Sequence, residues 1–176
     1  MVLGTAALID ECMARGLVRA GSRVDHARSR IGVAVRAGAI EPDISSPEAL
    51  GRALLAARSV AISSGPSGEY LAGLFLRMGI DQQLSHKLIR TPSGVMVGSL
   101  LSSGEAELGF QQIGELLPFR GIRYLGPLPD DVQQIIVFAG GVHAAAGDPP
   151  AARELLEFLN SPAASATLTI HGMEAS

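Results

Sequence analysis

Two segments rich in serine and glycine stand at the predicted starts of helices. Residues 63–68 read Ser-Ser-Gly-Pro-Ser-Gly, and residues 92–94 read Pro-Ser-Gly. The first turn of a helix presents free backbone N–H groups and a partial positive charge, so an anion can bind there. The hydroxyls of Ser64, Ser67 and Ser93 can add donors. The same residue types also cap helices without any ligand, so the pattern indicates either an anion site or two helix caps.

Amide and imidazole side chains give the next candidates. Gln111 and Gln112 end an apolar strand, where their amides can either meet a ligand or satisfy local backbone groups. His143 follows the apolar residues 135–138 and can lie near a strand end, although a hydrogen-bonded surface role explains it as well. The four histidines are widely spread and Cys12 is the single cysteine, so we expect no metal site and no disulfide.

Composition and missing motifs exclude several classes of function. The 176 residues carry 14 Lys+Arg against 17 Asp+Glu, with no basic run, which argues against a nucleic-acid partner. Neither a phosphate-binding P-loop nor the dinucleotide glycine motif is present, so we expect no nucleotide cofactor and no other cofactor. The Gly-x-Ser-x-Gly spacing of serine hydrolases is also missing. The apolar runs are too short to span a membrane, and the chain as given shows no signal peptide.

These candidate residues require a framework of alternating strands and helices. Strands are predicted near residues 1–4, 27–37, 59–63, 87–91, 106–111, 122–125 and 132–140. Helices are predicted near residues 5–15, 47–57, 69–78, 95–102, 112–117, 150–160 and 162–170. Strands that alternate with helices at this spacing indicate an α/β fold with mainly parallel sheets, whose ligands bind beyond the carboxyl ends of the strands.

The chain is predicted to cross between two lobes twice. Turn chemistry interrupts the pattern near Arg36 and again at residues 127–129. Residues 37–127 would then form one complete lobe, while residues 1–36 and 128–176 together form the other.

Several longer segments resemble one family of proteins. Residues 19–38 read RAGSRVDHARSRIGVAVRAG, residues 46–50 read SPEAL, residues 104–112 read GEAELGFQQ and residues 160–164 read NSPAA. Together they resemble the extracellular solute-binding proteins related to the periplasmic molybdate-binding family, over nearly the whole chain.

The resemblance implies a type II periplasmic binding fold that traps a small anion between two lobes. The implied partner is the membrane subunit of an ATP-binding cassette (ABC) importer, and the implied location is the periplasm. The family holds oxyanions with backbone N–H groups and hydroxyls, which places Ser64, Ser67, Gly68, Gly94 and Val95 in the cleft. Molybdate binders usually carry a tyrosine where this sequence has the two glutamines at its strand end, so an organic carboxylate suits the site at least as well as molybdate.

Full-length relatives carry about two further βα units ahead of the residues that match Met1. The resemblance therefore implies a first lobe that is incomplete, with an uncovered sheet edge that favours self-association and weak binding.

Two alternatives stay open. Some relatives are aconitate isomerases, and such an enzyme needs a base beside an anion cradle, for which Glu69 or His143 could serve. A self-contained α/β domain that acts through protein contacts is the third reading.

Overall fold

The computed structural model describes residues 1–176, which divide into two compact units. Unit 1 comprises Met1–Ser29 and Ile135–Ser176, and unit 2 comprises Arg30–Gln134. The chain therefore passes between the units twice. Both predicted crossings, at Arg36 and at residues 127–129, lie inside unit 2. The first crossing differs from the prediction because the long strand β2 (Val24–Arg36) runs from one unit into the other without turn residues.

The sheet of unit 2 has five strands in the order β6-β2-β5-β3-β4. The central strands β5 (Leu108–Gln112), β3 (Val60–Ile62) and β4 (Leu88–Arg90) are parallel to one another, as expected for consecutive βα units. Strand β2 pairs antiparallel with β5 on one side and with β6 (Ile122–Pro127) on the other. The α/β class is thus confirmed, with the parallel pairing concentrated where the candidate site residues lie.

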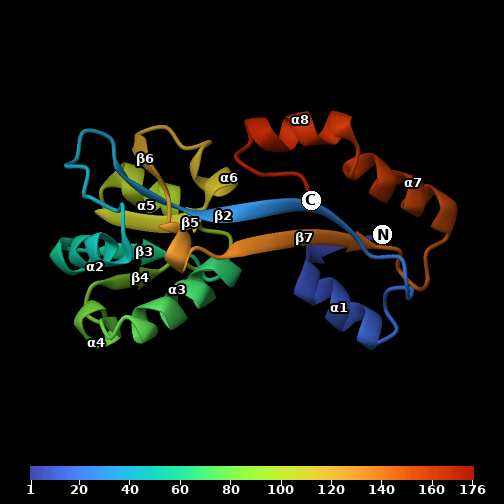
Figure 1. Ribbon diagram of the computed structural model, residues 1–176, viewed down its shortest axis with the longest axis horizontal. Helices are drawn as coiled ribbons and strands as arrows, with labels where there is room; N and C mark the ends of the chain where they lie inside the picture. The colour runs from blue at the N-terminus through green and yellow to red at the C-terminus, as the bar shows by residue number, and fades with distance from the viewer. The chain divides into compact units, whose positions relative to one another are not determined.

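Helices cover both faces of this sheet (Figure 1). One face packs against α2 (Pro47–Ala56), α3 (Pro66–Arg77) and α4 (Asp81–Leu84), and the other packs against α5 (Val97–Ser103) and α6 (Ile113–Leu116). Alternate residues of β2 supply the two cores: Val33 joins Leu50, Leu71 and Phe75 on one face. Burial of such side chains stabilises the unit by about 1.5–3 kcal/mol for each large one.

Local sequence signals explain where the helices begin. Ser46 caps α2 through a 3.2 Å hydrogen bond from the Ala49 backbone N–H, and Pro47 fills the first helical position. The helix thus begins at residue 47, where the sequence predicted it. The short α4 and the 3₁₀ turn η1 (Asp130–Val132) were not predicted, because three or four residues carry too little periodicity to read.

Unit 1 is built on the antiparallel pair β1 (Val2–Thr5) and β7 (Ile135–Gly141). Helix α1 (Ala6–Ala14) packs its buried Ile9 against Val18 and Ala139. Helix α7 (Pro149–Leu159) covers β7 with Leu156, and α8 (Pro162–Ile170) follows it.

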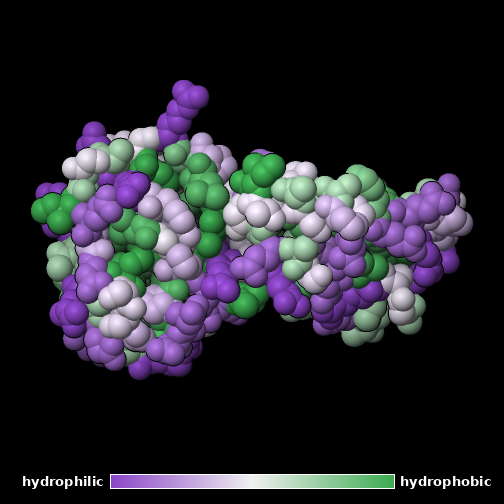
Figure 2. All heavy atoms as spheres, turned by 45° about the horizontal axis from the view of Figure 1, so that its top comes forward, coloured by the Kyte–Doolittle hydropathy of each residue, from purple (hydrophilic) through white to green (hydrophobic).

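The surfaces of the two units are mixed in polarity. On the face seen in Figure 2, hydrophobic residues lie among hydrophilic ones over each unit. Large hydrophobic side chains that remain exposed in unit 1 include Phe158 and Ile170, at 57% and 78%. No helix is both long and apolar enough to cross a membrane.

Candidate functional site

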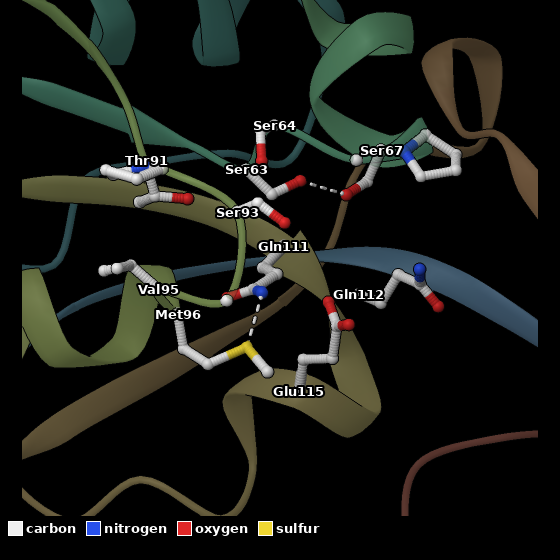
Figure 3. Close-up of a pocket in the computed structure, with 14 residues that line it drawn as sticks. Ser63, Ser64, Ser67, Thr91, Ser93, Val95, Met96, Gln111, Gln112 and Glu115 are labelled. Atoms are coloured by element: carbon white, nitrogen blue, oxygen red, sulfur yellow. Dashed lines mark hydrogen bonds between the residues drawn. The ribbon is translucent and has the colours of Figure 1, made fainter.

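Two strand-to-helix loops of unit 2, together with the end of β5 and the start of α6, line one pocket of about 190 Å³. The loops follow β3 and β4, so the pocket lies beyond the carboxyl ends of the parallel strands (Figure 3). Residues that line it are Ser63–Ser67, Thr91–Met96, Gln111, Gln112 and Glu115. The volume is below the roughly 300–1,000 Å³ typical of sites for drug-sized ligands, so it suits a small solute.

The first wall is the start of α3. The hydroxyls of Ser63 and Ser67 lie 2.9 Å apart and both side chains are buried. Gly68, which the sequence predicted as a site residue, does not line the pocket and lies behind this wall. A Cβ at Gly68 would lie 1.7 Å from the Ser63 carbonyl oxygen. Only glycine allows the loop and helix to approach so closely. The backbone N–H of Ser67 in the first turn has no intrahelical acceptor, so the wall presents a donor and the positive end of a 12-residue helix.

The second wall is the segment from Thr91 to Met96. The Thr91 backbone N–H donates to the Ile62 carbonyl at 3.0 Å, which ties the segment to β3. The Thr91 side chain is only 2% exposed, and its hydroxyl oxygen has no hydrogen-bond partner. Gly94 takes a φ of 82°, a left-handed conformation that glycine adopts without strain and that turns the segment toward α5. A buried hydroxyl without a partner costs about 1–3 kcal/mol of stability.

The end of β5 forms the third side. The Gln111 side-chain oxygen accepts a 2.8 Å hydrogen bond from the Val97 backbone N–H, and its nitrogen donates to the Met96 sulfur at 3.1 Å. The Gln111 amide therefore satisfies a local backbone group, which is one of the two roles that the sequence left open for it. Gln111 and Gln112 point in opposite directions from the strand (Figure 3), as successive strand residues do.

Glu115 supplies the pocket's single ionisable side chain. It is half-buried on α6, and its carboxylate lies beside Gln111 and Gln112 (Figure 3). Burial raises the pKa of Glu115 above its ordinary value of 4.5, against smaller opposing effects of hydrogen bonds from the Gln111 side chain and the Gln112 backbone. No lysine, arginine or histidine lines the pocket.

The structure brings most of the predicted site residues together. Six line the pocket: Ser64, Ser67, Gly94, Val95, Gln111 and Gln112. Ser93, also singled out in the sequence, lines it too.

The two predicted acid–base candidates lie elsewhere. Glu69 is exposed on the first turn of α3, outside the lining. His143 belongs to unit 1, where its Nδ1 accepts a 3.1 Å hydrogen bond from the Ala145 backbone N–H.

Sequence reasoning missed Thr91 and Glu115. For Thr91, the available signal was a hydroxyl residue between the end of a predicted strand and Pro92. For Glu115, the signal was its position three residues after Gln112, because a glutamate at this spacing can bond back to the N-cap residue of a helix.

A polar pocket at the carboxyl ends of parallel strands, on a chain of two α/β units, defines a class of proteins that bind small solutes. Residues 1–174 match the family described as bacterial extracellular solute-binding proteins, and the chain belongs to that family. The family indicates an extracellular location and a binding protein.

Relatives agree in fold and overlap in sequence. An aconitate isomerase from Pseudomonas sp. is 39% identical over 99% of this chain, which spans 66% of that protein's length. The periplasmic molybdate-binding protein of Azotobacter vinelandii superposes with a TM-score of 0.74 at 20% identity, covering 97% of this chain and 76% of its own. A substrate-binding domain from Clostridium difficile, ascribed to a molybdenum ABC transporter, gives 0.77 at 16% identity, covering 99% and 76%. The predicted type II periplasmic binding fold and the resemblance to the molybdate-binding family are thus confirmed.

Proposed function

We propose that the pocket of unit 2 binds a small anion, either an oxyanion or an organic carboxylate, for uptake into a bacterial cell. The observation that carries this proposal is the start of α3 in the pocket wall, where the Ser67 backbone N–H has no intrahelical acceptor. An oxygen of a bound anion would accept a hydrogen bond from this group.

Neutral donors on two sides of the pocket support an anionic ligand. The Ser67 backbone N–H and the positive end of α3 stand on one side, while the hydroxyls of Ser64 and Ser93 add donors. Gly94 and Val95 shape the second wall, and Gly68 supports the first from behind. Such a site neutralises an anion with dipoles, which are fixed in position and need no cationic side chain.

The family supports a transport role for this binding. We propose that the ligand passes to the membrane subunit of an ABC importer and that the protein works in the periplasm. Self-association stays a prediction; the exposed Phe158 and Ile170 of unit 1 would be candidates for such a contact.

Thermal unfolding with a panel of anions tests the proposal. The panel holds molybdate, tungstate, sulfate, phosphate, citrate and both aconitates. Binding to the native state adds about 2.7 kcal/mol of stability at a hundredfold excess over Kd, so at least one anion should raise the melting temperature. The shift should shrink in Ser93→Ala, which removes an exposed hydroxyl of the lining, and persist in Ser85→Ala, an exposed serine at the end of α4. A panel without any shift would contradict the proposal.

An isomerase is the second candidate function, favoured by the 39% identical aconitate isomerase. Moving a double bond within a tricarboxylate takes a proton from one carbon and returns one to another, so a base must stand beside the anion. Glu115 is the carboxylate that the pocket offers, whereas Glu69 and His143 remain proposals without a place in its lining.

Proton NMR of pure protein with trans-aconitate decides between the two candidates. Growth of the cis-aconitate signals, lost in Glu115→Gln and kept in Glu105→Gln, would favour the enzyme. Unchanged spectra together with a binding signal for any anion would leave the binding protein as the function.

A further inference from the structure

The pocket has one acceptor side among its donors. Hydroxyls and the start of α3 line two sides, and all of these groups are neutral. The third side carries the Glu115 carboxylate, the one charged group in the lining. When ionised, a carboxylate can only accept hydrogen bonds, so it repels any ligand atom that is also only an acceptor.

Glu115 stands beside a side chain whose own position is fixed. Its carboxylate lies next to Gln111 and Gln112 at the edge of the pocket (Figure 3). Gln111 cannot turn away, because its oxygen is held by the Val97 N–H at 2.8 Å. An ionised carboxylate has roughly four acceptor positions, and those that face the pocket need a donor from the ligand or from water.

The elements that line the pocket offer Glu115 no cation, and Arg30 of the adjacent strand β2 forms an ion pair with Asp130 at 3.3 Å. Strand β5 contributes only the amides of Gln111 and Gln112, and the loops at 63–67 and 91–96 carry no titratable side chain. Helix α5 carries none either. Tyr124 of β6 packs near Ile113 and Leu116 of α6, and it contributes nothing to the pKa of Glu115.

We propose that Glu115 is a specificity-determining residue that selects anions with a hydrogen-bond donor of their own, either a hydroxyl or a retained acidic proton. This inference rests on the proposed binding function. The class of ligand it names is the hydroxycarboxylates and partly protonated carboxylates. Fully ionised oxyanions such as sulfate and molybdate have only acceptor oxygens, so they can form no hydrogen bond with the Glu115 carboxylate. Both groups would then stay unpaired in a desolvated site, which lowers the affinity. Burial raises the affinity of Glu115 for its own proton, and a neutral Glu115 can donate, so the selection should weaken in acid.

Matched ligand pairs test this directly by isothermal titration. Malate differs from succinate by one hydroxyl, and citrate differs from tricarballylate in the same way. The wild-type chain should prefer the hydroxylated member of each pair by about tenfold or more, since a site built to bond a hydroxyl rejects the analogue that lacks it. Glu115→Gln should lose most of that preference and bind succinate more tightly than wild type does. Glu105→Gln removes an exposed carboxylate that precedes β5, and should keep the preference.

A second measurement needs no variant. Sulfate keeps its charge between about pH 5 and about pH 8, so any gain in its affinity at the acidic end reports protonation of the protein. Sulfate binding should tighten as pH falls, and malate should then lose its advantage. Equal affinity for malate and succinate, a preference unchanged by Glu115→Gln, or a flat sulfate profile would overturn the inference and leave anion binding intact. Absence of binding by every anion would overturn the proposed function as well.

Discussion

The side-chain oxygen of Gln111 lies 2.8 Å from the backbone nitrogen of Val97 and accepts its hydrogen bond. Val97 is the first residue of α5, so its N–H has no partner within the helix. One amide on β5 therefore holds both the start of α5 and the Met96 sulfur. A single side chain ties the end of β5 to the wall that ends at Met96.

Replacing Gln111 should cost stability as well as shape. Gln111→Leu leaves the buried Val97 N–H unpaired, which should lower the free energy of unfolding by about 1–3 kcal/mol. Gln112→Leu changes a neighbouring amide that makes no such bond and should cost less. Urea unfolding of the two variants measures the difference, and equal losses would contradict the role given to Gln111.

The close contact at Gly68 predicts opposite results for two glycines of α3. Gly68→Ala would force a Cβ against the Ser63 carbonyl, so the first wall must move and both stability and anion binding should fall sharply. Gly73→Ala meets only the end of the flexible Arg77 side chain, at 3.4 Å. Because alanine favours a helix interior by about 0.5–1 kcal/mol over glycine, this control should be slightly more stable than wild type. If thermal unfolding shows that both variants melt below wild type, or that both melt above it, the close contact at Gly68 is contradicted.

The unpaired hydroxyl of Thr91 should separate stability from binding. Thr91→Val keeps the shape and removes a buried polar group without a partner, so the free energy of unfolding should rise by about 1 kcal/mol. Anion affinity should change less than stability, because this oxygen has almost no surface open to the pocket. Thr5→Val is the control with the opposite sign: Thr5 caps α1 by accepting from the Leu8 N–H at 3.3 Å, and its loss should cost about 1 kcal/mol. A Thr91→Val chain that is less stable than wild type would show that the hydroxyl has a structural partner.

The raised pKa of Glu115 predicts how stability depends on pH. The folded chain holds this proton more tightly than the unfolded chain does, so the stabilising contribution is complete below the ordinary pKa of 4.5. It is lost as pH rises through the raised value. Glu115→Gln cannot ionise, and its free energy of unfolding relative to wild type should therefore increase with pH over that window.

Glu107 provides the opposite sign within the same unit. A 2.8 Å hydrogen bond from the Arg58 backbone N–H lowers the pKa of Glu107, so its contribution is present above the ordinary pKa and is lost in acid. Glu107→Gln should therefore fall further below wild type as pH rises. Parallel pH profiles for the two variants in urea unfolding would contradict these assignments.

Much of the framework could be predicted because it depends on local chemistry. Ser46 and Pro47 marked the start of α2, and the serine–glycine segments at 63–68 and 92–94 marked two loops that do line one pocket. Caps, turns and the alternation of strands and helices are written in neighbouring residues, so one sequence reveals them.

The remaining features depend on residues far apart in the chain. Thr91 is an unpaired hydroxyl only because β3, β4 and β5 bury it, and no short window of sequence records burial by other strands. Glu115 enters the pocket because a four-residue helix turns directly after β5. The boundary between units lies within β2, where an unbroken strand leaves no turn residues to mark it.

A nitrogen–proton correlation NMR titration of the ¹⁵N-labelled chain with citrate tests the central claim most directly, because it reports where the anion binds. We predict saturable shifts concentrated in the backbone N–H signals of residues 63–68, 91–96 and 111–115, with Ser67 and Thr91 among the largest. Saturable shifts centred on any other part of the chain, or none at concentrations where the other anions also fail, would contradict the assignment of this pocket as an anion site.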